Sequence, residues 1–124
     1  MGRFQGDLPE RTFEFAKGIV SIIDQLPHEN KGWVLGKQLL RSGTSIGANV
    51  READEALTDA EFTHKCSIAR KEASETNYWL LLCQDCSLLS GPILNDLINE
   101  SEEFVRILTT IVRKTQAYIK ESKQ

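Results

Sequence analysis

Glu61 and His64 are the first residues in the chain whose types and spacing suggest a metal site. Di-iron helical bundles use a Glu-x-x-His pair with this spacing, but they need two such pairs and two further carboxylates. The chain has one other histidine, His28, which follows Pro27 in an expected loop. Glu61 is also accounted for by a helix cap described below. The sequence therefore predicts no metal ligands.

Cys83 and Cys86 form a Cys-x-x-Cys motif, which in other proteins serves redox or zinc chemistry. A redox pair normally lies where a helix begins, because that position stabilises the thiolate. These two lie deep in an expected helix, and Cys66 is about five helical turns away from Cys83. Zinc would need two more ligands. We therefore expect ordinary buried cysteines.

No serine, histidine and carboxylate are spaced to suggest a nucleophile with its base. The glycine-rich fingerprints of phosphate and dinucleotide binding are absent as well. The sequence thus predicts a protein that is not an enzyme, with no cofactor and no small-molecule substrate.

Charged and polar residues recur at helical spacing in two of the expected helices. One face of the second helix carries Gln38, Arg41, Ser45 and Glu52. One stripe of the third helix mixes carboxylates with apolar groups: Ile68, Glu72, Glu75, Trp79, Leu82 and Cys86. An unpaired buried charge costs about 3–5 kcal/mol, so we expect the planar fork of Arg41 to bridge Glu72 and Glu75. The alternative is a solvated outer face.

Four amphipathic helices must position these residues, at about 8–26, 31–56, 58–89 and 92–121. Asp7 and Asn30 are expected to cap the first two helices. Thr58 and Glu61 form a capping box, flanked by Leu57 and Phe62 as a hydrophobic staple. We expect the first six and the last few residues to fray. Short connections predict one domain over 1–124, an all-α, antiparallel up-down-up-down four-helix bundle.

Gly36, Gly43 and Gly47 lie well inside the second helix. A glycine within a helix costs roughly 1 kcal/mol relative to alanine. Close approach of another helix is the favoured explanation, and a kink near Gly43 is the alternative.

Composition excludes several classes of protein. The 124 residues include 15 Lys plus Arg and 18 Asp plus Glu, for a net charge of −3, which argues against a general nucleic-acid coat protein. With 40% hydrophobic and 27% charged residues, the chain can fold around a core. It has no apolar run of roughly 18 residues and no secretory signal. We expect a cytoplasmic protein that does not enter the membrane.

Apolar groups on two sides of the third helix, Trp79 and Leu82 among them, must be buried or remain adhesive. We expect a second copy of the chain to cover them, which predicts a homo-oligomer. The second helix also has a local excess of positive charge, at Lys37, Arg41 and Arg51. Repeated around an oligomer, these side chains could bind RNA or DNA.

Two stretches resemble a bacterial family known as four helix bundle proteins, some of them encoded within intervening sequences of large-subunit ribosomal RNA genes. They are RSGTSIGANVREA at 41–53 and FTHKCSIARKEASETNYWL at 62–80. The resemblance implies an antiparallel bundle that assembles into a ring of five subunits, with no established enzymatic activity. It also implies structural or interface positions at Arg41, Ser45, Asn49, Glu52, Glu72, Glu75 and Trp79.

A related group, the accessory variability determinants of diversity-generating retroelements, is similar in fold and works with a reverse transcriptase and RNA. The expected function is accordingly a non-enzymatic, homo-oligomeric scaffold or adaptor whose partner is a protein or a nucleic acid. The alternative is an RNA- or DNA-associated accessory protein. A metal-dependent enzyme is a distant third hypothesis, because its ligands are missing.

Overall fold

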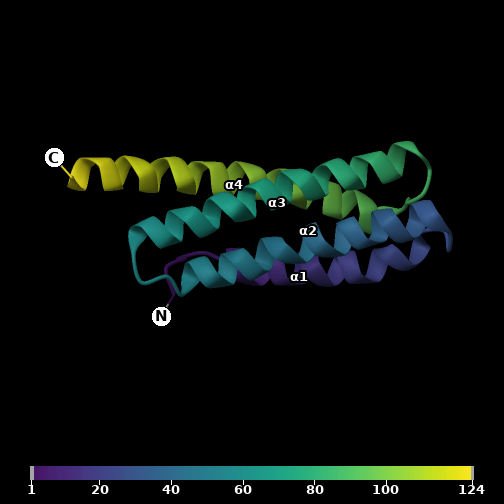
Figure 1. Cartoon of the computed structure of the whole chain (residues 1–124), viewed down its shortest axis with the longest axis horizontal. Helices are drawn as coiled ribbons and strands as arrows, with labels where there is room; N and C mark the ends of the chain where they lie inside the picture. The colour runs from purple at the N-terminus through teal and green to yellow at the C-terminus, as the bar shows by residue number, and fades with distance from the viewer. Residues whose placement is uncertain (1, 124) are drawn as a thin grey trace.

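A computed structural model describes residues 2–123 and contains four long helices. They are α1 (Leu8–Ile22), α2 (Asn30–Asp54), α3 (Asp59–Asp85) and α4 (Pro92–Ser122), with a 3₁₀ turn, η1 (Ile23–Gln25), after α1. Within the described residues there is no strand, which confirms the all-α prediction. Figure 1 shows that successive helices run in opposite directions and that both chain ends lie at the same end of the bundle.

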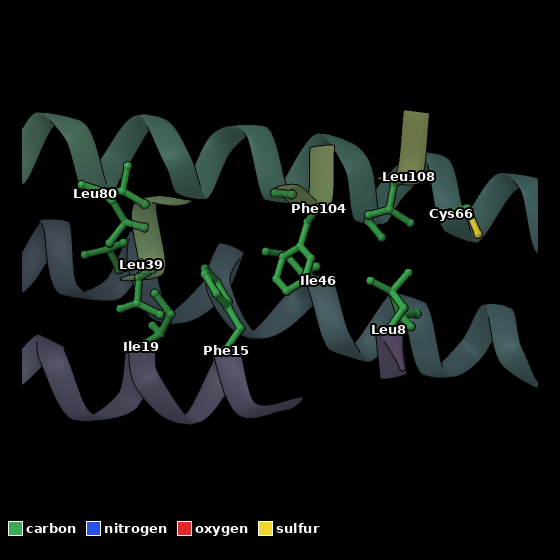
Figure 2. Packing of buried hydrophobic residues seen from close by; sticks show 14 of the residues in the cluster. Leu8, Phe15, Ile19, Leu39, Ile46, Cys66, Leu80, Phe104 and Leu108 are labelled. Atoms are coloured by element: carbon green, nitrogen blue, oxygen red, sulfur yellow. The ribbon is translucent and has the colours of Figure 1, made fainter. Parts of the chain in front are cut away.

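The core runs along the bundle axis between the four helices (Figure 2). α2 packs on α1 and α3, α3 packs on α4, and α4 also contacts α1. Phe15 of α1 meets Phe104 of α4 edge to face, with ring centroids 5.3 Å apart. Side chains from every helix are fully buried in this core, among them Ile19, Leu39, Ile46, Leu80, Leu94, Phe104 and Leu108. Each of the four helices thus turns an apolar face toward the core, as the amphipathic pattern predicts.

The glycines of α2 allow α1 to approach closely. A Cβ atom on Gly43 would lie 2.8 Å from Cγ1 of Ile19, and one on Gly47 would lie 3.2 Å from the carbonyl oxygen of Thr12. α2 continues without interruption from Asn30 to Asp54. Close packing, and not a kink that breaks the helix, explains Gly43 and Gly47, whereas a Cβ atom on Gly36 would make only an ordinary contact with Leu26 at 3.4 Å.

Several predicted helix ends were wrong. α1 ends at Ile22 and passes into η1, and Asp7 makes no side-chain cap hydrogen bond. Asn30 is the first residue of α2, so Glu29, which makes no side-chain cap bond either, stands at the cap position that we had assigned to Asn30. α2 stops at Asp54, two residues before the predicted end.

α3 ends at Asp85, four residues before the predicted Leu89. Ser87 takes a left-handed conformation with φ 58°. The amide of Leu88 then donates to the carbonyl of Cys83 at 2.8 Å, and the amide of Ser87 donates to Gln84 at 3.0 Å. This pair of bonds is a Schellman motif, which satisfies the last carbonyls and turns the chain away from the helix axis.

The start of α3 agrees with the prediction only in part. The hydroxyl of Thr58 accepts from the amide of Glu61 at 3.1 Å, as in a capping box. The Glu61 carboxylate, however, accepts from the amide of Leu57. Leu57 is 90% exposed, so the predicted staple does not form. Phe4 packs on Phe62 in its place, with ring centroids 5.3 Å apart.

Packing of Phe4 also corrects, for Arg3 and Phe4, the expectation that the first six residues fray; Met1 lies outside the described residues. Arg3 donates to the carbonyl of Ala56 and pairs with Asp59, both at 2.8 Å. The amide of Phe4 donates to Asp54 at 3.0 Å. These contacts tie the N-terminal residues to the junction between α2 and α3.

None of the helices within residues 2–123 has both the length and the apolar content that crossing a membrane requires.

Candidate interaction surfaces

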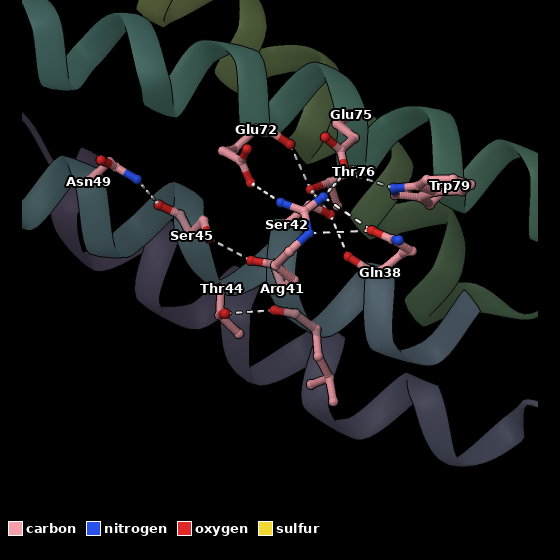
Figure 3. Close-up of polar contacts among 11 residues, drawn as sticks. Gln38, Arg41, Ser42, Thr44, Ser45, Asn49, Glu72, Glu75, Thr76 and Trp79 are labelled. Carbon is pink, nitrogen blue, oxygen red and sulfur yellow. Dashed lines mark hydrogen bonds and ion pairs between the residues drawn. The ribbon is translucent and has the colours of Figure 1, made fainter. Parts of the chain in front are cut away.

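Arg41 joins α2 to α3 on the outside of the bundle (Figure 3). Its guanidinium group donates to Glu72 at 3.1 Å and also to Glu75. The indole nitrogen of Trp79 donates to Glu75 at 3.0 Å, and Gln38 accepts from Arg41 at 3.2 Å. The structure thus brings together the three ionic residues that the sequence pairs, within a single chain.

Solvent reaches this network unevenly. The side chain of Arg41 is 47% exposed, that of Glu75 36% and that of Glu72 18%. Directly beneath lies a buried hydrogen bond in which the hydroxyl of Thr76 donates to that of Ser42 at 2.9 Å. The sequence analysis missed Ser42, although its position on the buried side of α2, next to Gly43, could have indicated it.

The other predicted interface residues line the same α2–α3 seam. Ser45 donates to the carbonyl of Arg41 at 2.5 Å, and Asn49 donates to that of Ser45 at 2.8 Å. Glu52 pairs with Lys65 of α3 at 3.2 Å. Trp79 and Leu82 are half-buried against neighbouring side chains. Of these residues, Glu52 is the one whose ion pair spans α2 and α3 within residues 2–123, and their role between subunits stays a prediction.

Several large apolar side chains are exposed on α1 and on the side of α2 that faces away from α3. Phe13 and Val20 of α1 are 57% and 53% exposed, and Trp33 of α2 is 63% exposed. Phe13 lines a groove of about 630 Å³. Trp33 and Leu40 line a second groove of about 410 Å³. We call Phe13, Val20, Trp33 and Leu40 the α1–α2 apolar patch. Sequence reasoning missed it.

Two seven-residue spacings in the sequence indicate this patch. Phe13 and Val20 are seven residues apart, as are Trp33 and Leu40, so each pair lies on one side of its helix. These positions fall outside the core stripes, which is why a search for the core alone passed over them.

Lys37, Arg41 and Arg51 do not form one cluster. Lys37 lines the groove beside Trp33, and Arg51 lines the groove beside Phe13. They are separated by roughly 21 Å along α2 at 1.5 Å per residue. Within residues 2–123 neither forms an ion pair, whereas Arg41 is occupied by Glu72 and Glu75. Only Lys37 and Arg51 therefore border the α1–α2 apolar patch.

The three cysteines occupy two kinds of environment. Cys66 and Cys83 are buried, and burial raises the pKa of the Cys66 thiol to about 12. Burial, followed by the nearby Cys86, raises the pKa of Cys83. Cys86 is exposed at the C-terminal cap of α3, so the expectation that it lies deep in a helix and is buried was wrong.

Residues suited to metal binding do not gather in the described part of the chain. Over residues 2–123 no three His, Cys, Asp or Glu side chains lie close enough to hold an ion. His64 is exposed, and the carboxylate of Glu61 accepts from the Leu57 amide.

Comparison with known proteins places this geometry in a family. The 23S rRNA-intervening sequence protein family matches residues 7–110. A crystal structure of a protein of unknown function from the S23 ribosomal protein family of Bacteroides thetaiotaomicron is 42% identical in sequence. That match covers 85% of this chain and 97% of the other, with a TM-score of 0.77. A comparison with curated proteins finds no match. The chain belongs to the 23S rRNA-intervening sequence protein family.

Proposed function

We propose that this protein is a non-enzymatic scaffold that assembles with copies of itself. The observation that carries the proposal is the α1–α2 apolar patch, where Phe13, Val20 and Trp33 are each more than half exposed. Apolar side chains exposed along two adjacent helices, with two grooves beside them, favour a contact surface. Aromatic side chains such as Phe13 and Trp33 are also the residues that most often anchor protein interfaces.

The ionic network of Arg41 lies on the same helix as half of the patch. A subunit that also reached across α2 to the side facing α3 would remove water from Arg41, Glu72 and Glu75 and so strengthen their attraction. Five copies is the number that the family resemblance implies, and five chains of 14.0 kDa give an assembly of 70 kDa. Free cysteines at Cys66, Cys83 and Cys86 suit a reducing, cytoplasmic setting.

Light scattering at micromolar concentration tests the assembly directly. The unmodified chain is expected to form particles with at least twice the mass of one 14.0 kDa chain. Phe13→Glu combined with Trp33→Glu places two charges in the patch and is expected to yield monomers. The matched control is Leu57→Glu with Ile93→Glu, which adds the same charge at two other exposed apolar positions, and it is expected to assemble normally. A stable 14.0 kDa particle from the unmodified chain would refute the proposal.

A second candidate function is association with RNA. Lys37 and Arg51 have no ion-pair partner within residues 2–123, and an assembly would repeat both cations in every copy. The description of the family refers to 23S rRNA. We expect the assembled protein to bind an RNA column at low salt and to elute as salt rises, because phosphate contacts release counterions. Lys37→Glu with Arg51→Glu should abolish retention, and absence of binding at low salt would exclude an electrostatic RNA role.

A further inference from the structure

α4 continues beyond the bundle that the other helices form. Val112 is its last buried residue among those described, yet the helix runs without a break to Ser122. Figure 1 shows this yellow segment passing the ends of α2 and α3. It also lies beyond residue 110, where the family match ends. We call residues 113–123 the α4 extension; its helical part, 113–122, is about 15 Å long at 1.5 Å per residue.

The α4 extension is basic and exposed. It carries Arg113, Lys114, Lys120 and Lys123 against the single carboxylate of Glu121, and none of these forms an ion pair within the described residues. Tyr118 is 60% exposed. Its helical part continues the 31-residue α4, but no residue after Val112 is buried among those described, so packing within the chain adds little to its stability. A partner surface would therefore stabilise this segment, and its charge requires that surface to be acidic.

Such a surface exists on the same molecule, between α1 and α4. A groove of about 850 Å³ is lined by two arginines and seven carboxylates, namely Asp7, Glu10, Glu14, Asp96, Glu100, Glu102 and Glu103, over the apolar side chains of Phe15 and Leu97. Three of the carboxylates are neutralised locally, because Arg11 pairs with Glu100 at 2.7 Å, Arg106 with Glu103 at 2.6 Å and Lys17 with Glu14 at 3.2 Å. Four negative charges remain in excess.

Charge is therefore divided sharply over the surface. The whole chain carries −3, whereas the α1–α4 groove together with the Lys17 that pairs with Glu14 carries −4, so all remaining residues together are positive by one. Asp7, Glu10, Asp96 and Glu102 have no ion-pair partner within residues 2–123. The α4 extension carries four cations against one carboxylate, a net charge of +3.

A chain cannot place its α4 extension in its own groove. Glu102 and Lys114 are on the same unbroken helix, roughly 18 Å apart along its axis. The extension points away from the groove, past the end of the bundle (Figure 1). Only another molecule can bring the two surfaces together.

We propose that the α4 extension of one copy docks, through its basic side chains, into the α1–α4 groove of a second copy. This inference rests on the proposed self-assembly and adds to it a contact separate from the α1–α2 apolar patch. The contact joins two different surfaces, so it is a head-to-tail interface, and such interfaces build rings when they close.

Charge reversal in the full chain tests the contact. Lys114→Glu with Lys120→Glu is expected to weaken self-association about tenfold or more in 50 mM salt, as several exposed pairs together would. The matched control, Lys31→Glu with Lys71→Glu, changes net charge equally on other exposed surfaces and should leave association within about twofold of the unmodified chain. Circular dichroism confirms that each variant is folded.

Complementary reversal identifies the partner. Glu10→Lys with Glu102→Lys in the groove should weaken self-association as strongly as the change in the extension. A chain that carries all four reversals has its charges exchanged, so its self-association is expected to recover. Analytical ultracentrifugation of the two separate double variants, mixed in equal amounts, should also show a complex that neither forms alone.

The possible outcomes separate this inference from the proposed function. If the unmodified chain is monomeric, both fail. If it assembles, and the Lys114→Glu, Lys120→Glu variant assembles equally well, only the docking of the extension is refuted. Failure of the four-reversal chain to recover would refute it too. If the Lys114→Glu, Lys120→Glu variant no longer binds the RNA column but self-associates like the unmodified chain, the extension binds nucleic acid and the inference is overturned.

Discussion

Arg41 is the residue at which sequence and structure agree most closely. Its guanidinium group meets Glu72 and Glu75 together, and the indole of Trp79 donates to Glu75. Two carboxylates on one face of α3 would repel each other without this cation. Arg41 thereby links the two central helices of the bundle on their outer side, above the buried hydrogen bond between Ser42 and Thr76.

Removal of Arg41 should cost more stability than removal of a neighbouring cation. Arg41→Ala is expected to lower the free energy of unfolding by about 1 kcal/mol, since partly exposed ion pairs contribute at about that level. Lys37→Ala is the matched control, because Lys37 lies on the same helix without an ion pair, and it should change stability by less than about 0.5 kcal/mol. Chemical denaturation of both variants measures the difference, and equal values would contradict the role of the network.

Arg41→Lys tests whether geometry matters beyond charge. An ammonium group cannot present two parallel donors to two carboxylates. We therefore expect Lys at this position to recover less than half of the lost free energy. Assembly is expected to follow the same order, with Arg41→Ala weakening the oligomer more than Lys37→Ala.

Cys66 makes the stability of the fold sensitive to alkaline pH. Burial raises the pKa of its thiol to about 12, whereas an unfolded thiol titrates near 8.5. Between these values the unfolded chain loses the proton and the folded chain keeps it, so stability is retained below about pH 8.5 and falls above it. We expect the free energy of unfolding to decrease by about 2 kcal/mol from pH 8 to pH 10 on this account.

Urea titrations across this pH range test the assignment to Cys66. Cys66→Ala should reduce the alkaline loss, leaving the smaller contributions of other groups such as Cys83. Cys86→Ala should leave the loss unchanged, because Cys86 is already exposed in the folded protein. An identical pH profile in all three proteins would show that the Cys66 thiol is not responsible.

At the scale of helices, the contact between α1 and α2 depends on the absence of a side chain at Gly43. A Cβ atom there would lie 2.8 Å from Cγ1 of the fully buried Ile19. We expect Gly43→Ala to destabilise the protein by about 1–3 kcal/mol, because overpacking a filled core exceeds the gain in helix propensity.

Gly36 provides the control within the same helix. A Cβ atom at Gly36 would make an ordinary contact, 3.4 Å from a methyl group of Leu26. Gly36→Ala should therefore stabilise the protein by up to about 1 kcal/mol through helix propensity alone. Thermal denaturation distinguishes the two changes by sign, and a stabilising Gly43→Ala would show that the helices are free to move apart.

Helix existence follows from the sequence, and helix ends follow from it only partly. Apolar periodicity and the breaks at Pro27 and Gly91 locate all four helices. Where α3 ends depends on Ser87, which adopts a conformation that favours glycine and closes a Schellman motif. Serine carries no special signal for that conformation, so the pattern alone extends the helix to Leu89.

At the scale of the whole molecule, the α4 extension contributes little to the stability of a single chain. No residue after Val112 is buried among those described. A chain that stops after Arg113 is expected to keep its free energy of unfolding within about 0.5 kcal/mol, while its helical signal in circular dichroism declines. A loss of several kcal/mol would show that the extension packs on its own bundle.

Sequence alone determined the fold and one of its ionic contacts. Helical periodicity fixes which side chains share a face, short connections make neighbouring helices antiparallel, and residues three and four apart bring Glu72 and Glu75 onto the side that Arg41 reaches. These features depend on local geometry, which a linear pattern contains.

Only the tertiary structure decided which surfaces remain uncovered. Leu57 looks like a staple residue but is 90% exposed. Trp79 donates to Glu75 within the chain, while Trp33 and Phe13 are 63% and 57% exposed. The division between a basic α4 extension and an acidic α1–α4 groove is equally invisible in a net charge of −3. Exposure depends on the distance and angle between helices that are far apart in the sequence, and periodicity within each helix does not specify either.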